Sequence, residues 1–201
     1  MKSLSFVIST FWVAAQLTAC SNEHASIANA IGSDSNGHSA PTTATIKNNQ
    51  QVIQQLPFSN QQDFIDAQQG FIASPKSLII NNTAGEPVWN MDEYTFINTP
   101  ANKAQNAPSS VNPSLWRQAN LNNINGLFKV TDGIYQLRGF DLANMTLIEG
   151  DTGWIVVDPL TAKETSKVAF DFAQQHLGNK PITAILFTHS HIDHFGGVQG
   201  V

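Results

Sequence analysis

The chain has 201 residues, which suits one globular domain or part of a larger one. Only 12% of the residues are charged, and the formal net charge is −5. This composition excludes collagen-like and coiled-coil proteins, as well as a nucleic-acid binder that relies on a basic face. Cys20 is the only cysteine, so an intramolecular disulfide and a cysteine-based zinc site are also excluded.

The first twenty residues predict an export signal. Lys2 precedes an uncharged apolar run at residues 4–19, which is shorter than the roughly 20 residues of a membrane span and has the length of a secretory core. Residues 17–20, Leu-Thr-Ala-Cys, resemble the lipobox of bacterial lipoproteins. That resemblance implies a lipid on Cys20, which becomes the mature N-terminus, and Ser21 beside it fits export to the outer membrane. An ordinary cleaved signal and an uncleaved anchor are the alternatives.

Residues 21–57 predict a flexible polar linker between this anchor and a folded domain. Ser, Asn, Ala, Thr and Gln dominate there without a sustained apolar period. Such a segment cannot bury enough surface to offset the entropy cost of ordering it. His24 and His38 lie in this linker, and we assign them no functional role.

Residues 58–126 predict an N-terminal segment that packs on the catalytic domain. Its predicted elements are a short helix at 63–69 that stops at Gly70, a hairpin with strands at 78–80 and 88–89, and a helix with Asn112 as its cap and Pro113 in its first turn. No catalytic constellation occurs among these residues, so we interpret the segment as a scaffold.

Residues 127–201 predict the first part of an α/β domain. Apolar runs between turn residues predict strands at 127–130, 133–138, 145–149, 154–157 and 182–187. Before the last strand, Thr161 and Glu164 match a capping box at the start of a helix, and Gly178 ends that helix. The unbroken apolar run at 154–157 predicts a strand covered on both faces. The order strand–helix–strand predicts a right-handed crossover between parallel strands, whose carboxyl ends are a common place for sites.

A cluster of metal-ligand residues follows the last predicted strand directly. Its members are three of the chain's six histidines and one carboxylate: His189, His191, Asp193 and His194. Imidazole and carboxylate groups suit zinc, and also iron or manganese. The first two can point to one ion from an extended turn, and the last two can face a second ion close by. Gly196 and Gly197 allow close backbone approach there. An incidental His-rich loop is the alternative.

The pattern His-x-His-x-Asp-His after a strand resembles the signature of the metallo-β-lactamase fold, a four-layer αββα sandwich with metals at its edge. Further stretches resemble the alkyl sulfatase branch of that superfamily. The two most specific are NPSLWRQ at residues 112–118 and NMTLIEGDTGW at residues 144–154. The resemblance therefore implies an α/β (α+β) fold class, namely the N-terminal part of such a sandwich, truncated after the histidine motif.

The same resemblance implies roles for individual residues. His189 and His191 would bind a first zinc ion, and Asp193 and His194 would contribute to a second. Asp158, at the end of its strand, would orient the histidine loop from behind; a helix-entry Asp before a proline is the alternative reading. Both Zn²⁺ ions would be completed by residues beyond Val201. Two more positions would lie near the mouth of the site: Asp141 and Asn144.

The activity implied by the resemblance is alkyl sulfate hydrolysis. A metal-activated water would attack the carbon that bears the sulfate ester, so that dodecyl sulfate, for example, would give an alcohol and inorganic sulfate. We expect a small-molecule substrate, no nucleic-acid partner, membrane contact through the lipid anchor only, and a homodimer in the complete protein. The location would be the periplasmic side of the bacterial envelope, at the outer membrane. The 201 residues alone would be inactive and poorly stable, because half the sandwich would be missing.

Two alternatives remain open at this point. One is another hydrolase of the metallo-β-lactamase fold, such as a lactamase or a thioester hydrolase. Compact enzymes of that kind begin their first strand soon after the signal peptide, whereas residues 21–126 precede it here, which favours the larger alkyl sulfatase architecture. The other is a non-catalytic truncated lipoprotein.

Overall fold

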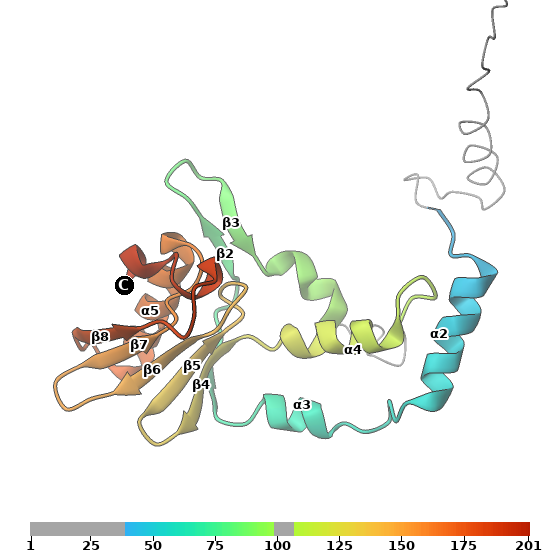
Figure 1. The fold of residues 1–201 in the computed structure, drawn as a ribbon, viewed down its shortest axis with the longest axis horizontal. Coiled ribbons are helices and arrows are strands. Elements are labelled where there is room, and N and C mark those ends of the chain that lie inside the picture. Colours follow the sequence, from blue (N-terminus) through green and yellow to red (C-terminus); the bar gives the residue numbers. More distant parts are fainter. Residues whose placement is uncertain (1–38, 99–106) are drawn as a thin grey trace, which may run out of the picture.

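A six-stranded sheet is the main element of the computed structural model, which describes residues 39–98 and 107–201, and α2, α3 and α4 extend away from it to one side (Figure 1). The strand order is β1-β4-β5-β6-β7-β8, and β2 and β3 form a separate hairpin. The strands of the large sheet are β1 Phe71–Ala73, β4 Gly126–Thr131, β5 Ile134–Arg138, β6 Met145–Glu149, β7 Trp154–Val157 and β8 Ile182–Leu186. All five strands predicted between residues 127 and 187 are therefore confirmed.

The connection from β7 to β8 is the unit that positions the candidate site. The pairs β4–β5, β5–β6 and β6–β7 are antiparallel, whereas β7 pairs parallel with β8. Helix α5, Lys163–Leu177, connects the two parallel strands and ends at Gly178, whose φ of 97° an L side chain rarely adopts. The predicted helix and parallel strand pair are confirmed.

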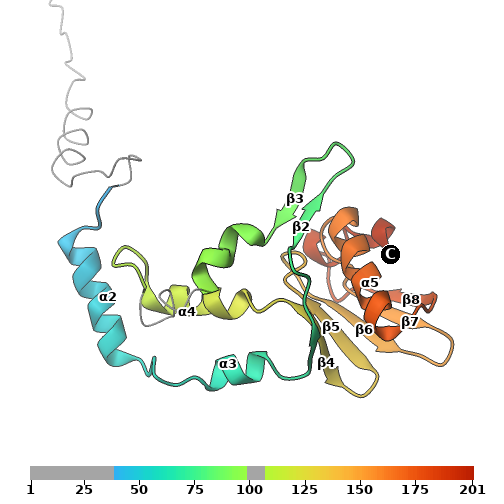
Figure 2. The same ribbon diagram turned by 180° about the vertical axis from the view of Figure 1, so that it is seen from behind.

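The main hydrophobic core lies on one face of the large sheet, between the sheet, helix α5 and the β2–β3 hairpin (Figure 2). Successive side chains of a strand point to opposite faces. In β7, Trp154 and Val156 are buried on the side of α5, whereas Ile155 and Val157 are only half-buried. The expectation that this strand is covered on both faces is therefore wrong for the described residues, which fully bury only the α5 face.

Helix α5 begins one residue later than the predicted capping box requires. Ala162 is the N-cap residue, and its N–H donates to Oγ1 of Thr165 at 3.3 Å. The hydroxyl of Thr161 instead donates to the buried carboxylate of Asp141 at 2.7 Å. The box of Thr161 and Glu164 is therefore wrong, because a carboxylate from a distant loop occupies this end of the helix.

The N-terminal segment contains the predicted helices and hairpin. Its elements besides β1 are α3 Gln62–Ala67, β2 Ile79–Asn81, β3 Pro87–Asn90, the 3-10 helix η1 Asp92–Asn98 and α4 Pro113–Asn122. The Asn112 side chain caps α4 by accepting from the Ser114 N–H at 2.9 Å, as predicted. Leu78 and Ile80 join the core under α5, while Ile97 and Trp116 form a second, small cluster. Strand β1, which antiparallel pairing holds against β4, was not predicted.

A helix occupies the described part of the predicted polar linker. Helix α2, Thr43–Gln55, contains no buried residue, and Thr42 caps it by accepting from the Thr45 N–H at 3.1 Å. The expectation of an unstructured linker is therefore wrong for these residues: the side chain of Thr42 caps the helix, the helix contacts α4, and the Asn49 side chain donates to the Ser109 carbonyl oxygen at 2.8 Å. The export signal, Cys20, His24 and His38 lie outside the described residues.

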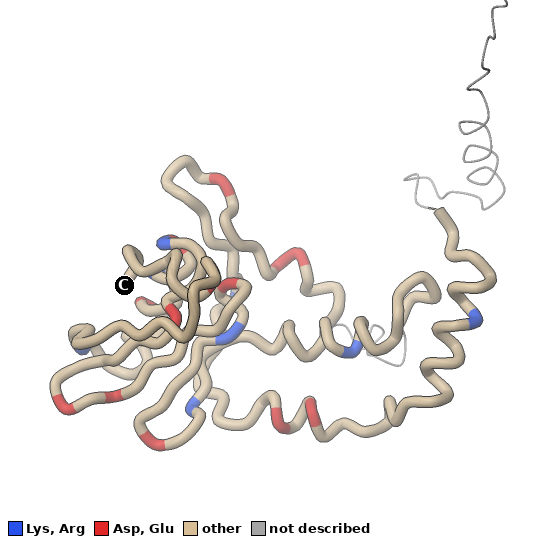
Figure 3. The backbone as a smooth tube through the Cα atoms, viewed as in Figure 1, with Lys and Arg blue, Asp and Glu red and all other residues tan. Residues whose placement is uncertain are grey.

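Charge and hydropathy add two observations on the part of the chain that the structure describes. Lysines and arginines are spread singly along it (Figure 3). None of its helices combines the length and the apolar character that crossing a membrane requires.

Gly153, which precedes β7, provides a test of this packing. A Cβ atom there would lie 2.2 Å from the carbonyl oxygen of Pro181, which also accepts from the Trp154 N–H at 2.7 Å. Because β8 cannot retreat without weakening that bond, we expect Gly153→Ala to lower the free energy of unfolding by about 1–3 kcal/mol. Urea denaturation measures this loss. Gly85→Asn, in an open turn with φ of 84°, is the control; an equal loss there would contradict the steric account.

Candidate metal centre

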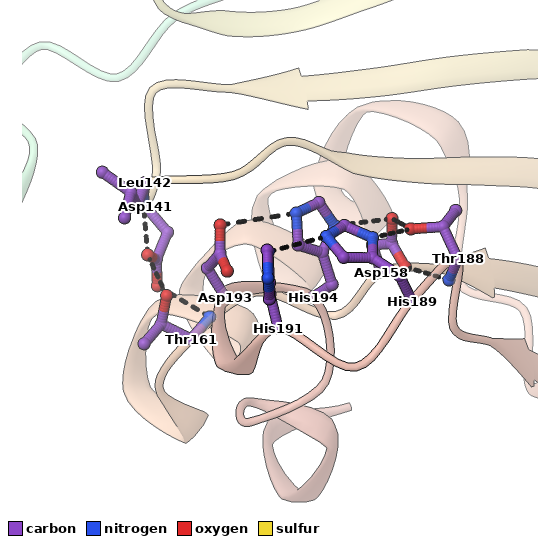
Figure 4. A network of polar contacts seen from close by, with 9 residues as sticks. All are labelled: Asp141, Leu142, Asp158, Thr161, Thr188, His189, His191, Asp193 and His194. Atoms are coloured by element: carbon purple, nitrogen blue, oxygen red, sulfur yellow. Dashed lines mark hydrogen bonds and ion pairs between the residues drawn. The ribbon is translucent and has the colours of Figure 1, made fainter.

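The carboxyl ends of β7 and β8 bring the predicted site residues together (Figure 4). Asp158 follows β7 directly, and its N–H donates to the carbonyl oxygen of Leu186 in β8 at 3.0 Å. The motif follows β8 as a loop from Thr188 into the short 3-10 helix η4, Ile192–His194. A second 3-10 turn, η5 Val198–Gly200, comes next. The parallel register thus places Asp158 behind the histidines.

His189 and His191 form the first pair of candidate ligands. Both side chains are exposed, and Nε2 of His189 lies 3.2 Å from Nδ1 of His191. Two nitrogen ligands of a tetrahedral zinc ion, each at about 2.0–2.1 Å, lie roughly 3.3 Å apart. The spacing of these two nitrogens therefore fits two ligands that share one ion.

Asp193 and His194 form the second pair. Oδ2 of Asp193 lies 3.4 Å from Nε2 of His194, and both side chains are about three-quarters buried. The ring of His194 also lies 4.0 Å from that of His189, measured between centroids, so the two pairs are adjacent. Across residues 39–98 and 107–201, however, no three His, Cys, Asp or Glu side chains are arranged to hold one metal ion. Each pair therefore offers two ligands.

The Asp158 carboxylate connects the two pairs from behind. It accepts from the Thr188 N–H at 2.8 Å, from the Thr188 hydroxyl at 2.7 Å and from Nδ1 of His194 at 2.8 Å. Because the hydroxyl proton goes to Asp158, the Thr188 oxygen can accept from Nδ1 of His189, which lies 2.9 Å away. With neutral rings, these bonds fit a proton on Nδ1 of both His189 and His194, and each Nε2 then faces its partner in the candidate pair, where it could bind a metal.

Burial and hydrogen bonding act in opposite directions on the pKa of Asp158. Desolvation raises it, but the hydrogen bonds from Thr188, together with the hydrogen bond and the charge of His194, outweigh that effect and lower the pKa. Asp158 also has a φ of 56°, which is uncommon for residues other than glycine, although Asp adopts it more readily than most. Strain of this kind is concentrated at functional sites.

Gly196 and Gly197 allow the loop after the motif to lie against the start of α5, as the sequence predicts. A Cβ atom would lie 2.3 Å from the Thr161 carbonyl oxygen at Gly196, and 2.2 Å from the Pro159 carbonyl oxygen at Gly197. Any side chain at these positions would therefore displace the loop that carries the candidate ligands.

Three further residues lie near the candidate ligands or were expected to lie there: Asp141, Asn144 and Thr188. Asp141 is buried, and together with Asn144 it lines a groove of about 450 Å³. None of the four candidate ligands lines this groove, so the expectation that the two residues lie at the mouth of the site stays a prediction. The role of Thr188 as the link between Asp158 and His189 was missed. The sequence feature that could have indicated this role is the position of Thr188, a hydroxyl residue directly between the end of a strand and the histidine motif.

The pH dependence of Asp158 gives a direct test of this network. A carboxyl group with a lowered pKa stabilises the folded state above its unfolded pKa of about 3.9, and that stabilisation is lost as the pH falls through the folded pKa. We expect a carboxyl-carbon NMR titration of metal-free protein to give Asp158 a midpoint below 3.9, and Thr188→Val to raise it. A midpoint at or above the ordinary value would contradict the described hydrogen bonds.

Comparison with known proteins gives consistent matches. Residues 138–201 match the Metallo-beta-lactamase superfamily. The chain is 48% identical to the (R)-specific secondary-alkylsulfatase of Pseudomonas sp, over 81% of this chain and 24% of that protein. It is 46% identical to the linear primary-alkylsulfatase of Pseudomonas sp (80% and 23%), and 47% identical to an alkyl/aryl-sulfatase of Saccharomyces cerevisiae (79% and 24%). The solved structure of a stereoselective inverting sec-alkylsulfatase from Pseudomonas sp. matches with a TM-score of 0.73 and 48% identity, over 80% of this chain and 24% of that one.

These matches confirm the predicted fold class and the predicted family. The chain spans about a quarter of the length of the curated relatives that it matches. The match to a solved alkylsulfatase structure covers 80% of this chain. Residues 138–201 thus resemble the metallo-β-lactamase superfamily, and about four-fifths of the chain is similar to part of the alkylsulfatases.

Proposed function

We propose that this chain contributes the first ligands of a binuclear metal site in a hydrolase that cleaves alkyl sulfate esters. The observation that carries the proposal is the pair of donor spacings at the carboxyl end of β8, 3.2 Å for His189 and His191 and 3.4 Å for Asp193 and His194. The superfamily implies a metal-dependent enzyme. The relatives at 46–48% identity bear the names of alkylsulfatases.

Zinc is the metal that this donor set favours, because three imidazoles and one carboxylate match its usual ligands. When bound, such ions would lower the pKa of a coordinated water towards neutrality and so supply hydroxide. His189 and His191 would hold one ion, and Asp193 and His194 the other. A catalytic zinc ion ordinarily has three protein ligands, so two ions need donors besides these four side chains.

The chain's own residues would mainly orient the ligands. Asp158 would hold His194 directly and His189 through Thr188, so that both rings present Nε2 to the ions without reorganisation. The strained backbone at Asp158 would be the cost of placing this carboxylate under the loop.

The reaction would be hydrolysis at the carbon that bears the sulfate ester. The bond from the water oxygen to carbon forms, the bond from carbon to the ester oxygen breaks, and inorganic sulfate leaves with the electron pair while the water proton passes to solvent. Attack at carbon inverts a secondary centre, and one structural relative is described as an inverting sec-alkylsulfatase. A lactamase or thioester hydrolase is not favoured, because three relatives at 46–48% identity are named as alkylsulfatases or an alkyl/aryl-sulfatase.

The remaining parts of the proposal concern location and assembly. We retain the lipoprotein signal at residues 1–20, with Cys20 lipidated and the protein on the periplasmic side of the outer membrane. Residues 58–126 would pack on the catalytic domain that begins at residue 127, and the complete protein would be a homodimer. Globomycin treatment, which blocks lipoprotein signal cleavage, would distinguish this from an ordinary signal peptide.

Zinc affinity tests the ligand assignment. We expect His189→Ala to lower the affinity of the chain for zinc by more than the roughly 10–100-fold that follows the loss of an outer partner. Competition against a chromophoric chelator measures it. His176→Ala is the matched control, because the imidazole of His176 contacts only the Phe172 carbonyl oxygen and ring among the described contacts. Equal losses in the two variants would contradict the assignment.

Product analysis tests the reaction. We expect the native protein that carries this sequence, loaded with zinc, to release sulfate from dodecyl sulfate and to leave a chromogenic cephalosporin intact. In water enriched in oxygen-18, attack at carbon places the label in the alcohol. Label in the sulfate would contradict attack at carbon, and cephalosporin cleavage without sulfate release would contradict the substrate class.

A further inference from the structure

Asp141 is a buried carboxylate in the loop between β5 and β6, only 7% exposed. Its Oδ1 accepts from the N–H of Leu142 at 2.5 Å and from the Thr161 hydroxyl at 2.7 Å. Its Oδ2 accepts from the N–H groups of Thr161 at 3.1 Å and Ala162 at 3.4 Å, and from the Thr165 hydroxyl. The Asp141 carboxylate therefore accepts from five donor groups. A helix cap needs fewer hydrogen bonds than this.

Four of these donors belong to the start of helix α5. The first N–H groups of a helix lack partners within the helix, and a negative charge near them is favourable. Asp141 supplies both the acceptors and the charge from a loop that precedes Thr161 by 20 residues. Because the side chain is buried, residues 161–165 cannot shift relative to the β5–β6 loop without leaving donors unpaired.

The opposite side of the same segment faces the loop of candidate ligands. A Cβ atom at Gly196 would lie 2.3 Å from the Thr161 carbonyl oxygen, and one at Gly197 would lie 2.7 Å from the Ala162 carbonyl oxygen. The Gly197 N–H also donates to the Leu160 carbonyl oxygen at 2.8 Å. The two glycines follow the last histidine of the motif by two and three residues, so the position of residues 160–162 determines where that histidine lies.

We propose that Asp141 is a positioning residue of the metal centre, which acts through residues 160–162 and the glycine contacts to hold Asp193 and His194 at their spacing from His189 and His191. Figure 4 shows this arrangement: Asp141 and Thr161 lie at one end of the row of ligands, and Asp158 and Thr188 at the other. The loop is thus supported by a buried carboxylate at each end. The inference rests on the metal site proposed above.

Asp141→Asn in the full chain tests the inference, because an amide keeps the size but offers one accepting oxygen in place of two. We expect the affinity for zinc to fall about 10–100-fold and the visible spectrum of the Co²⁺-substituted protein to change. Thr161→Ala removes one hydroxyl donor and should weaken zinc binding less, so it keeps the test valid where Asp141→Asn folds poorly.

Two controls separate positioning from general stability. Asp171→Asn makes the same chemical change on the same helix, where Asp171 is paired only with Lys167 among the described contacts, and it should leave the affinity unchanged. Leu127→Ala, in the core of β4, should lower the melting temperature without changing the Co²⁺ spectrum. Losses of zinc affinity in Asp141→Asn no larger than in Leu127→Ala would overturn this inference alone. Failure of the unaltered chain to bind zinc would instead overturn the proposed function.

Discussion

The parallel pairing of β7 with β8 is the constraint on which the candidate site depends. Both strands end at the same edge of the sheet, so the residue after β7 and the loop after β8 become neighbours although 30 residues separate Asp158 from Thr188. Helix α5 makes this pairing possible because it buries the apolar side chains of one sheet face as it connects the strands. The fold thus supplies the location, and the motif supplies the chemistry.

Two buried carboxylates, Asp141 and Asp158, hold the loop of candidate ligands in place. Each is removed from water, which is unfavourable for a charge, and each is compensated by several donors. Asp158 contacts Nδ1 of His194 directly and Nδ1 of His189 through Thr188, so that Nε2 of each ring is turned towards the other candidate ligands. Asp141 uses them to hold the start of α5 against the glycines after the motif. A metal loop that is exposed at its tip is therefore held firmly at its base.

The sequence predicted the parts of this arrangement that depend on neighbouring residues. Apolar runs between turn residues located the strands, and Gly178 located the end of α5, because these signals act over a few positions. The candidate ligands were proposed from residue type and spacing, and the structure brings these four side chains close together. The capping of α5 by Asp141 could not be predicted, because its donors lie 20 to 24 residues further along the chain. Strand β1 is three residues long and exists only through its pairing with β4. Helix α2 was not predicted because its polar composition shows no sustained apolar period, although Thr42 caps it.

The central claim is that the loop after β8 binds zinc through imidazole and carboxylate groups. Zinc K-edge X-ray absorption of the protein purified with its native metal measures the ligands directly. The account predicts nitrogen and oxygen neighbours at about 2.0–2.1 Å, with the outer-shell scattering of imidazole rings and a second metal nearby. A spectrum with only water-like oxygen neighbours, or a protein that retains no zinc, would contradict it.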